Sequence, residues 1–318
     1  MGGPRRTNLA LLLLLAVAFF SGWAAFMLSG QPARATLVLH GAAGVGIVLL
    51  VPWKAALSVR SIARRRGRSL WWPSVVLAVG IGVSIVFGVV HSAGRPYLGA
   101  GLSALEFHIG AALCVIPFAV WHLLARRVRP RQTDLSRRGF LAGSTLATAS
   151  LAGYFLLPSA ARAATGSFAI ASPAPTSWMF DAVPSLTAER WRLEIGGRRW
   201  SLDELAALAT TVTAHLDCTG GWWADAQWRG VWLARLLPSP PAGGSWWVRS
   251  ATGYTRRFPG GEPLLLAFEM NGATLPMGNG FPARLVAPRR RGYEWVKWVV
   301  AAGADQVPAW FQPPFPLQ

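Results

Sequence analysis

Acidic side chains are scarce in this sequence, and they are almost missing from its first half. The 318 residues include 13 Asp and Glu against 31 Lys and Arg, which gives a formal net charge of +18. Residues 1–163 hold 17 basic and 2 acidic side chains, whereas residues 164–318 hold 14 and 11. A nucleic-acid-binding protein carries its basic residues in a patch on a folded polar domain. Here the excess belongs to the apolar half, so we expect no nucleic-acid partner.

Cysteine is also rare. Cys114 lies inside a long apolar run and Cys218 lies in the polar half of the chain, so the two cannot pair and an internal disulfide is excluded. The second half must therefore be stabilised by its own hydrophobic core, which a segment of about 150 residues can supply.

Long apolar runs dominate the first half, and hydrophobic residues make up 53% of the whole chain. Four runs approach the ~20 residues that cross a bilayer, and a weaker fifth run follows. We predict an N-terminal transmembrane α-helical bundle of four spans in residues 1–130 and a fifth span, a signal or anchor, in residues 131–163. The runs cover residues 9–28, 35–51, 70–90, 102–124 and 140–157.

The basic residues of this half fall mainly at the N-terminus and in alternate loops, while Arg34 and Arg95 occupy the intervening loops. Cytoplasmic loops of membrane proteins carry such an excess of Lys and Arg. The pattern predicts a multi-pass protein of the cell membrane with a cytoplasmic N-terminus and an extracytoplasmic domain in residues 164–318.

A pair of arginines precedes the fifth run, in the order Ser-Arg-Arg-Gly-Phe-Leu at residues 136–141. This segment resembles an internal twin-arginine signal, which implies the twin-arginine export machinery as a partner. The alternative is that Arg137 and Arg138 are two further cytoplasmic charges. Ala-Arg-Ala at residues 161–163 offers a cleavage site, yet we expect the fifth span to remain as an anchor.

Four of the five histidines lie in or beside the apolar runs. Polar residues within spans are functional candidates by default, and imidazole is a common axial ligand of haem iron. We predict one haem b near the outer surface, ligated by His40 and His108, with His91 as the alternative outer ligand. A second haem on His122 would lack a histidine partner, because Lys54 occupies the expected position. For His91 and His122 a simpler role, capping a span or hydrogen bonding across the bundle, stays open.

The second half changes to short patterned segments separated by Gly and Pro. Residues 191–197, 211–216, 246–250 and 264–270 are predicted as strands, and residues 202–208 as a short helix. The fold predicted for residues 164–318 is therefore α+β. Cys218 follows one strand and precedes two glycines, and a lone thiol in that position suits a metal thiolate or a nucleophile.

Five ordered motifs in this half resemble the sulfite-oxidase-type molybdopterin domain, over about residues 175–305. The resemblance is greatest to the bacterial methionine-sulfoxide-reductase-like branch and to forms fused to an N-terminal cytochrome-b-like membrane bundle. The motifs are Leu-Asp-Cys-Thr-Gly-Gly-Trp at 216–222, Trp-Arg-Gly-Val at 228–231, Ser-Ala-Thr-Gly-Tyr at 250–254, Asn-Gly-Phe-Pro-Ala-Arg-Leu-Val-Ala-Pro at 279–288 and Gly-Tyr-Glu-Trp-Val-Lys-Trp at 292–298.

The resemblance implies a molybdenum-molybdopterin cofactor and a set of site residues. Cys218 matches the catalytic cysteine whose thiolate binds molybdenum. Asn279 and Arg284 match a segment that contacts the pterin and its phosphate. A loop that holds the cofactor matches Gly292, Tyr293 and Lys297. Arg and Lys are suited to a phosphate, and a glycine allows close backbone approach.

The implied activity is that of a molybdopterin-dependent oxidoreductase. Electrons would pass between a membrane quinol, haem b and the molybdopterin centre, which would exchange an oxygen atom with a small-molecule substrate. Basic residues are not evident around Cys218, and Trp222, Trp223 and Trp228 cluster there instead. These tryptophans either form an apolar pocket or fill the core. Sulfoxide or N-oxide reduction is therefore favoured; the alternatives are sulfite-type oxidation and a non-catalytic electron-transfer or assembly subunit.

Overall fold

The computed structural model describes residues 4–64, 72–94, 103–125, 131–157, 160–175 and 182–313. The chain divides into two compact units, residues 1–168 and 169–318, which are treated separately below. Most of the loop arginines on which the topology prediction depends, including Arg65, Arg66, Arg95 and Arg126, lie outside the described residues.

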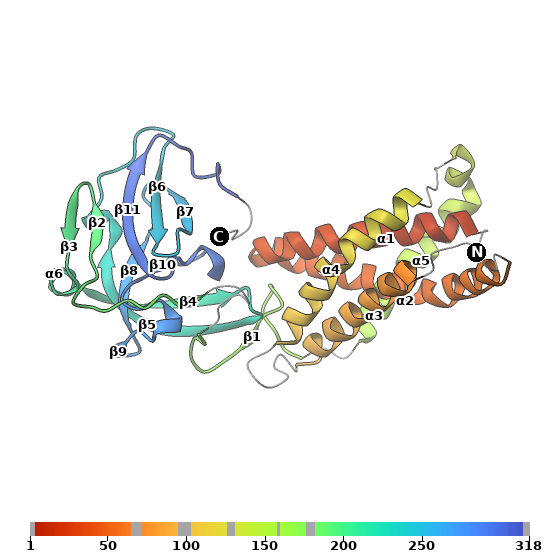
Figure 1. Cartoon of the computed structure of the whole chain (residues 1–318), viewed down its shortest axis with the longest axis horizontal. Helices are drawn as coiled ribbons and strands as arrows, with labels where there is room; N and C mark the ends of the chain where they lie inside the picture. Colours follow the sequence, from red (N-terminus) through yellow and green to blue (C-terminus); the bar gives the residue numbers. More distant parts are fainter. Residues whose placement is uncertain are drawn as a thin grey trace. The chain divides into compact units, whose positions relative to one another are not determined.

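The described part of the first unit contains five α-helices that are each long and apolar enough to cross a membrane. Each coincides with one of the predicted runs. They are α1 (Pro4–Met27), α2 (Gly30–Arg64), α3 (Trp72–Ser92), α4 (Ala104–Ala125) and α5 (Arg137–Leu156), coloured from red to yellow-green in Figure 1.

Small residues bring these helices together in pairs. α1 packs on α2, α3 on α4, and α2 on α5. A Cβ added to Gly153 would lie 2.8 Å from Val45, and one added to Gly46 would lie 2.7 Å from the Ser150 hydroxyl. Close backbone approach of this kind is the usual basis of helix packing in lipid.

The described part of the second unit contains two sheets. β4–β5, β5–β8, β8–β9, β8–β10, β2–β3, β6–β7 and β6–β11 are antiparallel pairs, and β11 and β2 are parallel. The first sheet has the order β1-β5-β8-β10, with β4 paired to β5 and β9 to β8; the second has the order β3-β2-β11-β6-β7. Figure 1 shows β11, β6 and β7 side by side in the second sheet. The strands are β1 (Phe168–Ala169), β2 (Leu193–Ile195), β3 (Arg198–Trp200), β4 (Thr210–Cys218), β5 (Trp222–Trp232), β6 (Ser245–Ser250), β7 (Thr255–Pro259), β8 (Leu265–Met270), β9 (Ala273–Thr274), β10 (Arg284–Val286) and β11 (Val299–Asp305).

One hydrophobic core contains side chains from both sheets, including Leu193, Leu216, Trp228 and Phe258. The four predicted strands are present as β2, β4, β6 and β8, and the predicted short helix is α6 (Leu202–Ala206). The prediction of an α+β domain is confirmed.

Two long strands, β5 and β11, were not predicted. β5 alternates strictly, with its even-numbered residues buried from Trp222 to Trp228, but its inward positions are partly alanine, which weakens the apolar signal. β11 is largely buried along its first half and shows no alternation, so a period of two was not available to detect it.

Candidate functional site

The centre of the candidate site is the tight turn between β4 and β5. Cys218 is the last residue of β4 and pairs with Trp222, the first residue of β5. Alternation along β4 places Ala214 and Leu216 in the core and Cys218, two residues on, on the same side. The Gly220 N–H donates a hydrogen bond to the Cys218 Sγ at 3.3 Å. Gly221 has φ +88°, which only glycine adopts without strain.

A second segment, residues 289–294, closes over the base of this turn. A Cβ added to Gly292 would lie 2.9 Å from the Cys218 Cα and 3.1 Å from the Asp217 carbonyl oxygen, so only glycine fits there. The neighbouring Arg291 forms an isolated main-chain bridge with Asp217. Its Nη1 also lies 2.6 Å from the Asp217 Oδ1, in a pair that is almost fully buried.

Three cations surround the thiol. Burial raises the pKa of Cys218, and the Gly220 N–H together with the charges of Lys297, Arg291 and Arg284 opposes that rise. Burial lowers the pKa of Arg284 to about 10, so this guanidinium remains protonated at neutral pH. The three cations therefore favour negative charge at the Cys218 sulfur, against the larger effect of burial.

Several buried polar atoms around the thiol have no hydrogen-bond partner within the described parts of the chain. They are the Oδ1 of Asn279, the Nε of Arg284 and the Nε of Arg291, on side chains that are 1%, 3% and 5% exposed. A buried polar atom without a partner costs about 1–3 kcal/mol. Arg284 and Arg291 act on the thiol, and the Asn279 carbonyl oxygen accepts a hydrogen bond from Arg284, so the three atoms indicate a site built to receive a polar ligand.

The remaining contacts fix these groups in place. The Arg284 guanidinium lies over the rings of Trp228 and Trp295, at 5.2 and 5.6 Å from their centroids, and its Nη1 donates to the Asn279 carbonyl oxygen at 3.0 Å. The Asn279 Nδ2 donates to the Pro173 carbonyl oxygen at 3.1 Å. A frame of two indole rings therefore holds the buried cation, since a cation over an aromatic face is favourable.

Residues 180–305 match the protein family described as "Oxidoreductase molybdopterin binding domain". Most of the described second unit is thus similar to a molybdopterin-binding oxidoreductase domain. Sulfite oxidase of Gallus gallus is 29% identical over 177 residues, covering 41% of this chain and 38% of that protein. A protein of Azospira oryzae named as the protein-methionine-sulfoxide reductase subunit YedZ1 is 32% identical over 135 residues, covering 38% of this chain and 51% of that protein.

Among solved structures, the sulfane dehydrogenase SoxCD of Paracoccus pantotrophus matches with a TM-score of 0.36 and 28% identity, over 39% of this chain and 40% of that one. The chain thus spans about half or less of the length of each of these relatives.

The residues around Cys218 fit a molybdopterin. The cofactor carries an anionic phosphate and a polar heterocycle, and the site offers unpaired donors on Arg284 and Arg291 and an unpaired acceptor on Asn279. Coordination to a metal deprotonates a thiol, which overcomes the raised pKa of Cys218. Lys297 would complete the cationic set; its Nζ now donates to the Gly278 carbonyl oxygen at 2.8 Å.

Tyr293, another residue predicted to bind the cofactor, makes a backbone hydrogen bond that positions its loop. Its carbonyl oxygen accepts a 2.6 Å hydrogen bond from the Tyr254 hydroxyl. The Trp295 indole N–H donates to the Arg290 carbonyl oxygen at 3.1 Å. These two bonds hold residues 290–293 of the second unit against the rest of the fold.

The sequence argument missed Arg291 and the cationic surroundings of Cys218. Because Arg289, Arg290 and Arg291 are consecutive, the sequence did not indicate which of them turns inward. The three tryptophans do not line one apolar pocket together. Trp222 and Trp228 are 2% and 0% exposed and belong to the hydrophobic core. Trp223 lies on the opposite face of β5, with its ring 4.9 Å from that of His215.

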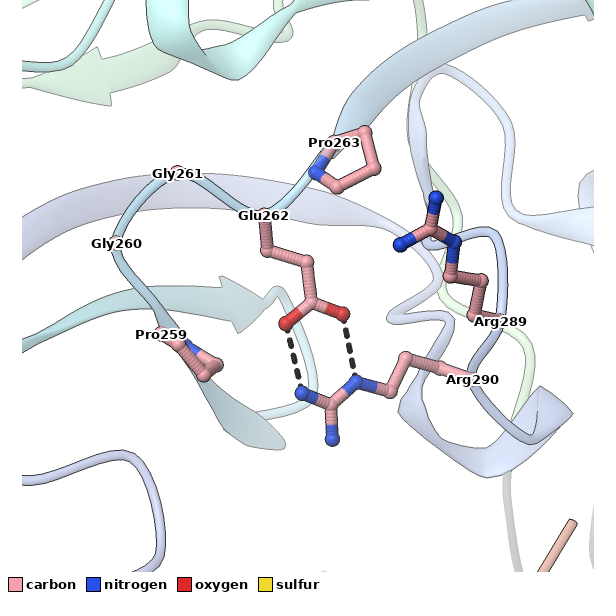
Figure 2. Close-up of a pocket in the computed structure, with 7 residues that line it drawn as sticks. All are labelled: Pro259, Gly260, Gly261, Glu262, Pro263, Arg289 and Arg290. Carbon is pink, nitrogen blue, oxygen red and sulfur yellow. Dashed lines mark hydrogen bonds and ion pairs between the residues drawn. The ribbon is translucent and has the colours of Figure 1, made fainter.

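An open groove of about 410 Å³ lies beside this loop, between residues 259–263 and the pair Arg289 and Arg290. Figure 2 shows the bidentate ion pair that crosses it, with the Arg290 Nε 2.6 Å from one carboxylate oxygen of Glu262 and its Nη2 2.7 Å from the other. Cys218 does not line this groove. Arg289, on the other side of the groove, has φ +74°, a backbone conformation that glycine adopts most easily.

In the first unit the structure brings His40 and His108 together, with ring centroids 5.6 Å apart. The His40 Nδ1 lies 2.8 Å from the Ala18 carbonyl oxygen, and the His108 Nδ1 lies 2.7 Å from that of Ser84. A carbonyl oxygen accepts a hydrogen bond from a protonated Nδ1, and this tautomer leaves the Nε2 lone pair of each ring for a metal.

Glycines make room for both rings of this pair. A Cβ on Gly22 would lie 2.9 Å from His40, and one on Gly88 would lie 3.0 Å from His108. The other two histidines do not join them in a single cluster: the His122 Nδ1 lies 3.2 Å from the Ser74 hydroxyl, and the His91 ring packs edge-on against Phe168 at 5.2 Å. The haem-ligand role of these histidines stays a prediction.

Proposed function

We propose that this chain is a membrane-anchored molybdenum oxidoreductase whose reaction takes place at Cys218. The observation that carries the proposal is the group of unpaired buried polar atoms on Asn279, Arg284 and Arg291 beside that thiol. Such atoms are costly in a folded protein unless a ligand satisfies them. The similarity of the second unit to a molybdopterin-binding family names the ligand class.

Each residue has a role that follows from its chemistry. The Cys218 thiolate would hold the metal, and Gly292 leaves the space for the cofactor-binding loop to approach it. Arg284, Arg291 and Lys297 would neutralise the anionic phosphate and hold its position, while Asn279 would accept a hydrogen bond from the heterocycle. When bound, the molybdenum centre supplies two-electron transfer of an oxygen atom.

The first unit would supply the electrons through one haem b ligated by His40 and His108. This arrangement is supported by the pairing of the two rings and by the carbonyl partners of both Nδ1 atoms. A single haem is favoured because His122 hydrogen-bonds with Ser74 and the Lys54 Nζ donates to the Asn8 side chain at 2.8 Å. A membrane quinol is the proposed electron donor.

The favoured reaction is reduction of a small sulfoxide or N-oxide. The relative named as a methionine-sulfoxide reductase subunit supports this direction. Sulfite-type oxidation is the second candidate, and the buried cations Arg284 and Arg291 beside Cys218 favour it, because they would attract an anionic substrate. A non-catalytic subunit is the weakest of the three, since the thiol and its cations are all present.

The proposed location is the cell membrane, with the N-terminus in the cytoplasm and the second unit on the extracytoplasmic side after export by the twin-arginine machinery. The five apolar helices and the Arg137-Arg138 pair at the start of α5 support it. Ser136 caps that helix through a hydrogen bond from the Gly139 N–H, so the paired arginines occupy its first turn.

The test is elemental analysis for molybdenum and iron on the detergent-purified chain, together with a reduced-minus-oxidised visible spectrum. The proposal expects about one molybdenum per chain and a b-type spectrum. Turnover is then compared on methionine sulfoxide, on trimethylamine N-oxide and on sulfite, with dyes as electron donor or acceptor. Absence of molybdenum from protein that retains haem would overturn the catalytic proposal, and turnover of sulfite alone would reverse the favoured direction.

A further inference from the structure

A buried histidine outside the predicted haem pair lies at the end of the bundle where α3 finishes. His91 is the penultimate residue of α3 and is 8% exposed. Its Nδ1 is buried and has no hydrogen-bond partner among the described residues. A buried imidazole nitrogen that makes no hydrogen bond destabilises the fold. A hydroxyl group bound to that nitrogen would remove the cost.

Polar groups of the neighbouring segments converge on the same end. The Arg162 Nη1 donates to the Ser92 hydroxyl at 3.1 Å, and its Nη2 donates to the Tyr154 hydroxyl at 3.4 Å. The Phe168 ring packs against the His91 imidazole. The cluster therefore offers an unpaired nitrogen, a fixed guanidinium, a phenol and an aromatic face.

This cluster is adjacent to both members of the His40–His108 pair. Gly88, one helical turn before His91 on α3, lies against the His108 ring. The Tyr154 ring packs on Gly41, the residue that follows His40. A ligand bound at His91 would thus be separated from the two proposed haem ligands by Gly88 and by Tyr154 with Gly41.

We propose that His91, Tyr154 and Arg162 form the site that binds and oxidises the membrane quinol, an inference that rests on the proposed function. A quinol hydroxyl would donate to the His91 Nδ1, and Tyr154 and Arg162 would donate to the oxygen at the other end of the ring. The apolar tail would lie along the outer surface of α5, where Phe155 and Leu156 are 68% and 85% exposed.

The redox step balances within the proposed electron path. One quinol becomes one quinone and releases two electrons and two protons. The proposed haem, which His40 and His108 would hold, would accept these electrons one at a time, and the proposed molybdenum centre would use them to reduce the substrate. The first proton passes to the His91 Nδ1 and the second to water.

The experiment uses the full chain in lipid nanodiscs and follows haem reduction by decyl-ubiquinol in a stopped-flow spectrometer. His91→Phe keeps an aromatic ring but removes the acceptor, and we expect the rate to fall at least about tenfold, while His91→Gln retains an acceptor and loses less. Thr145→Val is the matched control, because the exposed Thr145 hydroxyl bonds only to the Leu141 carbonyl of its own helix among the described contacts. Its rate should equal that of the unmodified chain.

A second readout does not depend on haem. Binding of a fluorescent hydroxyquinoline N-oxide, a quinol analogue, should weaken at least about tenfold in His91→Phe and stay unchanged in Thr145→Val. Equal binding and equal reduction rates in His91→Phe would overturn the site, and loss of haem from that variant would make His91 an iron ligand instead. An unmodified chain that lacks haem but binds the analogue through His91 would contradict the proposed electron path and leave the site standing.

Discussion

The two units of this chain differ in how many large apolar side chains they expose. The helical unit exposes large apolar residues along every helix, for example Leu13 at 66%, Val79 at 58% and Phe155 at 68%. Within the described part of the second unit, the exposed large hydrophobic residues are few: Val183, Leu208, Met277, Trp310 and Phe311. A surface as apolar as that of the first unit is unstable in water, so lipid is the solvent in which that unit is stable.

Among the described residues, the second unit buries charged side chains and the first unit buries none. Arg256 and Arg284 are buried over aromatic rings, and Arg291 and Glu294 are buried as well, whereas the buried polar residues of the helical unit are hydroxyls and His91. Buried charge is stable only with partners. The buried charges of the second unit suit the proposed anionic cofactor, and the uncharged histidines of the first unit suit the proposed haem. Separate variants can test the two proposals.

The largest effect is expected at the thiol. Cys218→Ser should reduce substrate turnover more than about 100-fold, because losses of outer-shell partners alone cost 10–100-fold and this residue is the proposed metal ligand itself. The haem spectrum should not change, since the variant lies in the other unit. Turnover assays beside a reduced-minus-oxidised spectrum measure both, and retained activity would remove Cys218 from the metal site.

The complementary experiment removes one proposed haem ligand from the helical unit. His40→Ala should reduce haem per chain at least about tenfold while molybdenum per chain stays constant, because one of the two axial ligands is lost. Pyridine haemochrome and elemental analyses give the two numbers. His215→Ala is the control, as His215 is an exposed histidine of the second unit that pairs with Asp225 at 2.9 Å. Haem retained in His40→Ala would contradict the proposed ligand pair.

A smaller effect on molybdenum content is expected when a buried arginine of the second unit is replaced, and none when an exposed arginine is replaced. Arg284→Met should lower molybdenum per chain about tenfold, since a hydrogen bond to a charged group contributes roughly 1.5–3 kcal/mol. Arg229→Met should leave it unchanged, because the pair of Arg229 with Glu269 is partly exposed and such surface pairs contribute about 0–1 kcal/mol. Equal loading of the two variants would show that Arg284 does not contact the cofactor.

The smallest effect concerns pH. The hydrogen bond from Arg257 lowers the pKa of Asp305, and the Val307 N–H adds to this. A carboxyl whose pKa is lowered by folding stabilises the fold above its unfolded pKa, and that stabilisation is lost as the pH falls. Asp305→Asn should therefore lower the free energy of unfolding at pH 7 by less than about 1 kcal/mol, and the melting temperature should fall with it. The difference should shrink below about pH 4; thermal unfolding at both values measures it, and a difference that grows in acid would contradict the assignment.

Much of this architecture was predictable because its signals are local. The five apolar runs correspond to the five long helices, and the alternation around residues 211–218 correctly located β4 and the turn at Cys218. The spacing of apolar and small residues determines these elements, and each can be seen within ten to twenty residues.

The pairing of side chains across the fold was less accessible. The sequence put His40 and His108 at similar depths but did not show that each Nδ1 meets a backbone carbonyl, of Ala18 and Ser84. It also left three consecutive arginines equivalent, although only Arg291 turns inward to Asp217. These outcomes depend on which helices and loops become neighbours, which is a property of packing.

The sequence alone determined the two-part organisation, the membrane-spanning lengths and the identity of the thiol, because hydrophobic period and motif order are written along the chain. Only the tertiary structure decided which cations surround Cys218, which tryptophans fill the core, and that the His91 Nδ1 is buried without a hydrogen-bond partner among the described residues. The surroundings of Cys218 arise when strands from residues 210–232 and loops from residues 279–297 meet, and His91 is buried where the end of α3 meets residues of the segment that follows α5. Long-range contacts of that kind leave no local pattern in the sequence.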